Sequence, residues 1–142
     1  VVSDAVNLSS RLENLTKLYD ASILISMDTF IGLDDQEEFN FRILDRVKVK
    51  GKEKFVTVIE IIDGYEEKKL ENMLECKIFF EEGVTSYLNK EFGKAIDLFK
   101  KVIRIIPDDK ATRIYIQRAE YYQEHNVPIG WDGVEVLEEK FY

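Results

Sequence analysis

Cysteine and histidine are nearly missing from this chain. Each occurs once among 142 residues, as Cys76 and His125. A lone cysteine excludes a disulfide within these residues and a cysteine-based zinc site, and a lone histidine excludes a histidine-dependent triad or a multi-histidine metal centre built from them. Because the one cysteine, Cys76, cannot form a disulfide within the sequence, a reducing compartment, the cytoplasm, is the simplest expectation.

The chain also lacks long apolar runs and an excess of positive charge. No apolar run approaches the roughly 20 residues of a membrane span, and residues 1–4 lack the features of a signal peptide. The 20 Lys and Arg residues are outnumbered by 28 Asp and Glu, which gives a net charge of −8. Because binding to nucleic acid or to an anionic membrane needs clustered positive charge, we expect neither partner. Any anionic ligand must be held by a local basic patch.

The 45% hydrophobic content is enough for one core or two small ones. The first 64 residues predict a mixed α/β arrangement, because a helical apolar period gives way to short runs rich in β-branched residues. The expected elements are a helix at 5–19, a strand at 23–25, a short helix opened by Ser26 or Asp28, strands at 39–47 and 55–62, and a turn at 50–53.

Beyond residue 64 the period is helical. We expect a long helix to about Leu88, a second helix to about Ile106 that is ended by Pro107, and a third from about Asp109 to His125. The fold class is therefore α+β, with a boundary at 63–68. The expected parts are residues 1–64, a helical module at 65–126, and a tail at 127–142 with a possible edge strand.

One short motif points to chemistry. Asn7 and Arg11 are four residues apart and would share a helical face; taken alone, such a pair is most often a solvated surface. The stretch Ser3-Asp4-Ala5-Val6-Asn7-Leu8-Ser9-Ser10-Arg11-Leu12-Glu13, however, resembles the helix of class III adenylate and guanylate cyclases that begins Gly-Asp-x-Val-Asn. Three further stretches follow in the order of that family: Ile23-Leu24-Ile25-Ser26, Phe41-Arg42-x-Leu44-Asp45-Arg46 and Val49-Lys50-Gly51-Lys52.

The resemblance covers about residues 1–62 and implies roles for three of them. It implies that Asn7 orients the ribose of a nucleoside triphosphate, that Arg11 stabilises the charged transition state as pyrophosphate leaves, and that Lys50 contacts the triphosphate. A fixed guanidinium suits the negative charge that develops on the bridging and leaving oxygens. The alternative for Arg11 is a salt bridge with Glu13 or Asp4. Ser3 and Ser9-Ser10 depart from the family pattern at the helix entry.

Lys50 also ends a run of alternating basic residues. Arg46, Lys48 and Lys50 should project from one face of a strand, with Val47 and Val49 on the other. This would be a local cationic strip in an acidic protein. The alternative is that these residues only provide solubility and protect a sheet edge.

The resemblance also implies partners that these residues do not supply. Cyclases of this family need two metal-binding aspartates on strands before the Asn-Arg helix, and no metal ligand is assigned in this chain. Mg²⁺ or Mn²⁺ is expected in the parent enzyme, with ATP or GTP as substrate. The active site is built between two cyclase domains, which implies a homodimer. The chain alone is therefore expected to be inactive.

The helical part resembles one tetratricopeptide repeat, a helix-turn-helix unit of about 34 residues. Gly83 and Ala95 would let two helices approach closely, and Phe79, Phe92 and Phe99 would fill the space between them. Pro107 also matches, whereas Glu82, Asn89 and Val102 depart from the pattern. One repeat cannot bury both its faces, so the third helix should cap it. A plain helical hairpin without a peptide-binding role is the alternative to a surface for a protein partner.

The tail is expected to pack Trp131 and to pair residues 134–136 on a sheet edge. The sequence leaves two functions open. The chain is either the C-terminal part of a cyclase that acts in second-messenger signalling, or a non-catalytic scaffold or dimerisation module with a helical interaction surface. A bacterial origin is the expectation from the domain combination.

Overall fold

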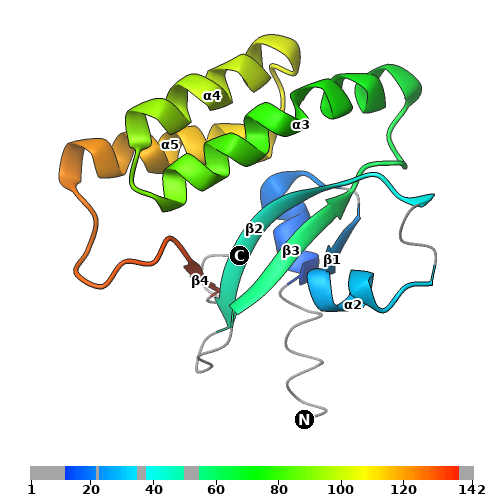
Figure 1. Cartoon of the computed structure of the whole chain (residues 1–142), viewed down its shortest axis with the longest axis horizontal. Helices are drawn as coiled ribbons and strands as arrows, with labels where there is room; N and C mark the ends of the chain where they lie inside the picture. The colour runs from blue at the N-terminus through cyan, green and yellow to red at the C-terminus, as the bar shows by residue number, and fades with distance from the viewer. Residues whose placement is uncertain (1–11, 22, 35–37, 50–54, 138–142) are drawn as a thin grey trace. The chain divides into compact units, whose positions relative to one another are not determined.

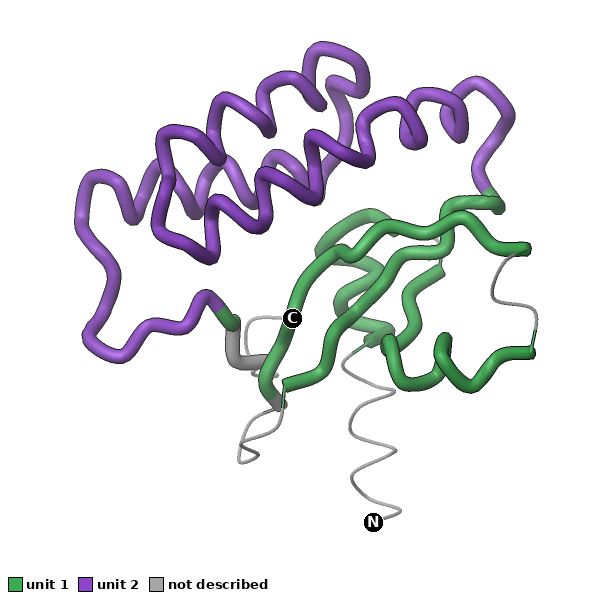
Figure 2. Tube along the Cα trace, in the orientation of Figure 1, with its two compact units in different colours: residues 1–64, 134–142 green, residues 65–133 purple. Residues whose placement is uncertain are grey.

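The computed structural model describes residues 12–21, 23–34, 38–49 and 55–137, and it divides the chain into two compact units. The sheet unit comprises Val1–Gly64 and Val134–Tyr142, and the helical unit comprises Tyr65–Gly133 (Figure 2). The division at Gly64 falls where the sequence changes from a mixed to a helical period. The tail is shared, because residues 127–133 belong to the helical unit and the rest to the sheet unit.

The sheet unit has four strands in the order β1-β3-β2-β4 (Figure 1). Strands β1, β3 and β2 are antiparallel neighbours, whereas β4 is parallel to β2. This mixture of helices and a small sheet confirms the α+β class. Its elements are a helix at 12–19, β1 (Leu24–Ser26), α2 (Met27–Ile31), β2 (Phe41–Val49), β3 (Phe55–Ile61) and β4 (Glu135–Leu137).

A β-bulge in β2 reverses which side chains face which side of the sheet. Ile43 pairs with Ile59, but the next pair along β3 is Val58 with Asp45, so one residue of β2 is extra. Because side chains alternate along a strand, the extra residue moves every later side chain of β2 to the opposite face. Val47 is therefore fully buried, and Arg46 and Lys48 are only half-buried.

Each face of the sheet is covered. On one face, Phe30 of α2 packs with Ile59 and Ile61 of β3, and its ring lies 4.8 Å from that of Phe41. Ser26 fixes the start of α2, since its hydroxyl accepts a hydrogen bond of 3.1 Å from the Thr29 amide. The helix at 12–19 is attached to β2 through Tyr19, which donates a hydrogen bond to Asp45.

The helical unit contains three helices at the expected places: α3 (Glu67–Leu88), α4 (Phe92–Ile105) and α5 (Lys110–His125) (Figure 1). Glu66 caps α3, because its carboxylate accepts hydrogen bonds from the Lys68 and Lys69 amides. None of the helices in the described part of the chain has both the length and the hydropathy that crossing a bilayer requires.

The core of this unit corrects one prediction. Phe80, not Phe79, is the fully buried phenylalanine of α3, and its ring centroid lies 5.8 Å from those of both Phe99 and Tyr115. Phe79 is half-buried, and Lys101 lies over its ring. Tyr115 of α5, which the repeat pattern did not indicate, is 1% exposed and stacks on Phe99.

Gly83 has the role that its spacing predicted, because α3 and α4 meet there. A Cβ atom at this position would lie 2.6 Å from the Phe99 ring. We expect Gly83→Ala to lower the free energy of unfolding by about 1–3 kcal/mol, since the overpacking outweighs the gain in helix propensity. Urea denaturation followed by circular dichroism measures this loss.

Gly93→Ala is the matched control, because its Cβ would meet only the end of the Gln123 side chain at 3.4 Å. This variant should be as stable as the parent or slightly more so. Adding Phe99→Leu to Gly83→Ala should recover part of the loss. Equal stability of the two glycine variants would contradict the close approach.

Candidate functional site

The three residues that the sequence assigned to the site, Asn7, Arg11 and Lys50, lie outside the described residues. The structure instead shows the elements that flank them. Helical residues 12–19 follow Arg11 directly, and β2 runs to Val49, immediately before Lys50. The geometry of the candidate site is therefore built from this helix and this strand.

Tyr19 and Asp45 connect these two elements. Tyr19 is 2% exposed and Asp45 is 4% exposed, and the tyrosine hydroxyl donates to Asp45 Oδ2. The other carboxylate oxygen of Asp45 accepts from the Arg46 amide at 2.8 Å. A buried carboxylate with hydrogen bonds on both oxygens fixes local geometry. The helix that follows Arg11 is thus held against the strand that leads to Lys50.

Sequence reasoning missed this connection. Tyr19 was only the last residue of the helix expected at 5–19, and Asp45 was only part of a motif. The signal that was available is the polar tip of an otherwise buried tyrosine, which usually finds a hydrogen-bond acceptor.

The described part of the cationic strip lies on one face, as the alternation predicted. The guanidinium of Arg46 is 5.0 Å from the centre of the Phe55 ring, and the Lys48 ammonium is 5.7 Å from it. Phe55 pairs directly across from Lys48 and is 44% exposed. Cation–π contacts of this kind hold the two charges near the end of β2. They also give both residues a structural role. A strip that binds an anionic ligand and a strip that only provides solubility and protects the sheet edge therefore both stay open.

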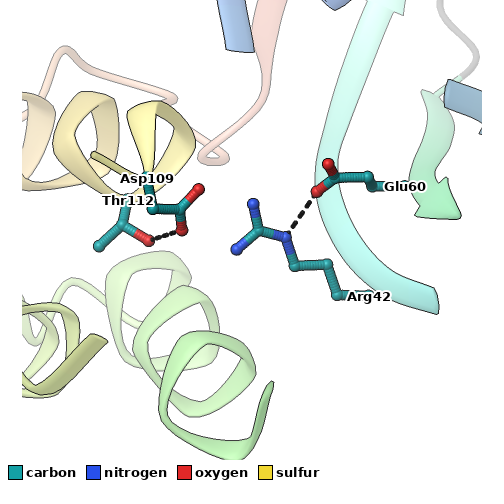
Figure 3. A network of polar contacts seen from close by, with 4 residues as sticks. All are labelled: Arg42, Glu60, Asp109 and Thr112. Carbon is teal, nitrogen blue, oxygen red and sulfur yellow. Dashed lines mark hydrogen bonds and ion pairs between the residues drawn. The ribbon is translucent and has the colours of Figure 1, made fainter. Parts of the chain in front are cut away.

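A buried ion pair joins β2 and β3 nearer the start of β2. Arg42 and Glu60 are cross-strand partners, and Arg42 Nε donates to Glu60 Oε1 at 2.7 Å (Figure 3). Their side chains are 5% and 1% exposed. In the helical unit, Thr112 donates a hydrogen bond of 2.6 Å to Asp109, the residue that precedes α5 (Figure 3). Both contacts act within their own unit as structural polar pairs.

The described residues do not fit a metal centre. Among them, no group of three or more His, Cys, Asp or Glu side chains gathers closely enough to hold an ion. His125 stacks on the Tyr121 ring at 4.3 Å, and Cys76 is buried with 1% exposure. We therefore assign no metal ligand among the residues that the structure describes.

The helical unit carries an open groove of about 750 Å³ along α3 and the start of α4. Leu74 and Ile78 are its apolar residues, with 43% and 59% exposure. Lys77, Glu81 and Lys94 also line it, so charges of both signs surround the apolar positions. A groove of this composition suits an amphipathic peptide better than a small anion.

The chain contains a region related to adenylate cyclases. It is 40% identical over 120 residues to the terminal-differentiation-specific adenylate cyclase of Dictyostelium discoideum. The aligned segment is 82% of this chain and 6% of that protein. It is 44% identical over 62 residues to an adenylate cyclase of Anabaena cylindrica. That aligned segment is 43% of this chain and 12% of the relative. No protein-family model and no solved structure matches the chain.

The similarity to the Dictyostelium protein is not confined to the sheet unit. It covers 82% of the chain, more than the sheet unit, which is residues 1–64 and 134–142, can contain. The aligned segment therefore includes part of the helical unit. The chain spans only a small share of both relatives, as the coverage shows.

Proposed function

We propose that this chain forms part of the catalytic region of a class III nucleotide cyclase, which converts ATP, or less favourably GTP, to the 3′,5′-cyclic nucleotide and pyrophosphate. The observation that carries the proposal is the 40% identity, over 82% of the chain, to a protein named adenylate cyclase. The ordered motifs around Asn7, Arg11 and Lys50 support the same function.

In this proposal each of the three residues has one task. Asn7 orients the ribose so that its 3′-oxygen faces the α-phosphorus. Arg11 stabilises negative charge on the bridging and leaving oxygens as the P–O bond to pyrophosphate breaks. Lys50, the residue after Val49 in the sequence, holds the triphosphate as a point charge. The Tyr19–Asp45 hydrogen bond supports this division of labour, because it connects the helix that follows Arg11 in the sequence to the strand that precedes Lys50.

The metal ions and the second cyclase domain that the reaction requires are proposed to come from outside this chain's three site residues. Mg²⁺ or Mn²⁺, bound by aspartates that we do not assign here, supplies the charge neutralisation that phosphoryl chemistry requires. A second cyclase domain, most simply a second copy, completes the active site. The parent enzyme acts in signal transduction in the cytoplasm, and the chain alone does not turn over nucleotide.

A chimera tests the proposal. The segment of the Anabaena cylindrica adenylate cyclase that matches this chain would be exchanged for the corresponding residues of this chain, and cyclic AMP formation would be measured. Activity within about tenfold of the parent enzyme is expected, because the identity over the matched segment is 44%. A folded chimera without activity would contradict the proposal. The isolated chain serves as the control and should form no product.

Lys50 gives a second measurement in the same chimera. Lys50→Ala should raise the KM for ATP about tenfold, because one charge-assisted contact to phosphate is lost. Lys54→Ala removes the same charge from the same segment and should leave KM within about twofold of the parent. Equal effects of the two substitutions would show that only net charge matters, and would exclude a specific contact at Lys50.

The second candidate function is a non-catalytic scaffold, in which a tetratricopeptide-like helical module binds a protein partner or dimerises. The groove with exposed Leu74 and Ile78 favours it. Sedimentation of the chain tests self-association, and a strict monomer at micromolar concentration would count against a dimerisation module.

A further inference from the structure

Tyr19 is held at the very end of the helix at 12–19. The helix stops directly after it, because Asp20 adopts a left-handed conformation with a φ of +52°. The Ala21 amide then donates a hydrogen bond of 3.0 Å to the Thr16 carbonyl, which caps the last turn. Tyr19 is also 2% exposed, so packing restrains its ring. Its hydroxyl group therefore has a well-defined place.

The bulge in β2 decides that Asp45 lies on the face of the sheet where Tyr19 reaches it. With the register that β2 has up to Ile43, Asp45 would lie opposite Thr57, and its side chain would be on the other face. The extra residue instead places Asp45 opposite Val58. The Tyr19 hydroxyl donates its hydrogen bond to the carboxylate on that face. The bond therefore exists only in the bulged register.

A hydrogen bond between these side chains fixes the helix against the strand more closely than an apolar contact would. Apolar surfaces stay in contact as they slide, whereas an O–H···O bond is lost outside a range of roughly 2.5–3.0 Å. The carboxylate of Asp45 is itself restrained, because its other oxygen accepts from the Arg46 amide at 2.8 Å. The pair thus sets the position of the helix along β2.

We propose that Tyr19 and Asp45 are positioning residues for the cyclase reaction, which align Arg11 with Lys50. One peptide bond joins Arg11 to the first described residue of the helix, and one joins Lys50 to the last residue of β2. Because the two residues act on the same triphosphate, a misplacement of about 1 Å is costly. The kinetic role rests on the proposed function, whereas the register itself does not. The whole device lies within the sheet unit.

Amide hydrogen exchange of the 142-residue chain tests the register. The Arg46 amide reports the orientation of the Asp45 carboxylate, to which it donates. Tyr19→Phe should speed exchange at Arg46 about tenfold relative to residues 58–60, which pair with both β1 and β2. Leu15→Val is the matched control, because it trims another buried side chain of the same helix and keeps the hydrogen bond. Equal relative exchange at Arg46 in the two variants would overturn the register.

Kinetics of an Anabaena chimera that includes residues 12–49 of this chain test the positioning role. Tyr19→Phe should lower kcat about tenfold and leave the KM for ATP within about twofold, because alignment in the transition state is lost while each group still meets the substrate. Leu15→Val should leave kcat within about twofold. A merely structural role would lower only the folded fraction, and it would do so in both variants.

A double-mutant cycle separates the pair from its members. Asp45→Ala should lower kcat at least as much as Tyr19→Phe, and adding Tyr19→Phe to it should change kcat less than twofold, because the bond is already absent. Additive losses, or parent kcat in Tyr19→Phe, would overturn the positioning role and leave the proposed function standing. An inactive but folded parent chimera would overturn the proposed function and the positioning role together, while exchange at Arg46 would still decide the register.

Discussion

Replacement of Arg11 by alanine should lower kcat for cyclic AMP formation by about 10²- to 10³-fold in the Anabaena chimera, with little change in KM. The proposed task of the guanidinium arises only as charge moves onto the leaving oxygens, so its loss affects the transition state more than bound substrate. Removing one such preorganised donor from an active site costs about 2.7–4 kcal/mol. Initial rates at saturating ATP measure the effect.

Two controls define what Arg11 contributes. Arg11→Lys keeps the charge but loses the planar fork, and it should recover only part of the rate. Lys17→Ala makes the same change in net charge at an exposed position of the helix at 12–19, and it should leave kcat within about twofold. If Arg11→Ala turned over ATP at the parent rate, the transition-state role would be wrong.

Local signals were sufficient to predict the helices of the described residues, but not the ends of β2. The strand was expected at 39–47 and is found at Phe41–Val49. It begins later because Asn40 is used elsewhere: its amide and side chain donate to Asp63 at 2.6 and 2.8 Å. It ends later where β4, from the far end of the sequence, pairs with it. Both causes are long-range contacts, which a local pattern cannot contain.

The core of the helical unit shows the same limit. The repeat pattern selected Phe79, but adjacent helical residues point about 100° apart, and α5 decides which ring is buried. Tyr115 of α5 packs against both Phe80 and Phe99. Gly83 could be predicted because its reason, the close approach of α3 and α4, lies within the repeat itself.

At the candidate site, the sequence could name residues but not the contacts that support them. The motif gave Asn7, Arg11 and Lys50 through their order in the chain. The bulge that decides which face Arg46 and Lys48 share, and the hydrogen bond from Tyr19 to Asp45, both depend on strand register. The register of a strand is set by many weak pairings together, so it cannot be predicted from any single residue.

The Arg42–Glu60 pair carries the largest expected effect on stability. Glu60→Ala should lower the free energy of unfolding by about 3–5 kcal/mol, because it leaves the Arg42 guanidinium, 5% exposed, without the carboxylate across the strand. Urea denaturation of the chain, followed by circular dichroism, measures the loss. A loss below about 1 kcal/mol would show that water or another group compensates the charge.

Two further variants separate burial from charge. Glu71→Ala removes a carboxylate from the exposed Lys68–Glu71 pair, whose side chains are 75% and 61% exposed, and it should change stability by less than about 0.5 kcal/mol. The double substitution Arg42→Met and Glu60→Leu removes both buried charges, and it should be far less harmful than Glu60→Ala alone, or even stabilising. If the double variant were as unstable as the single one, packing rather than the buried charge would account for the cost. If it recovers stability, the pair costs desolvation energy that an apolar pair would not, and its value lies in fixing the register of β2 on β3 before the bulge.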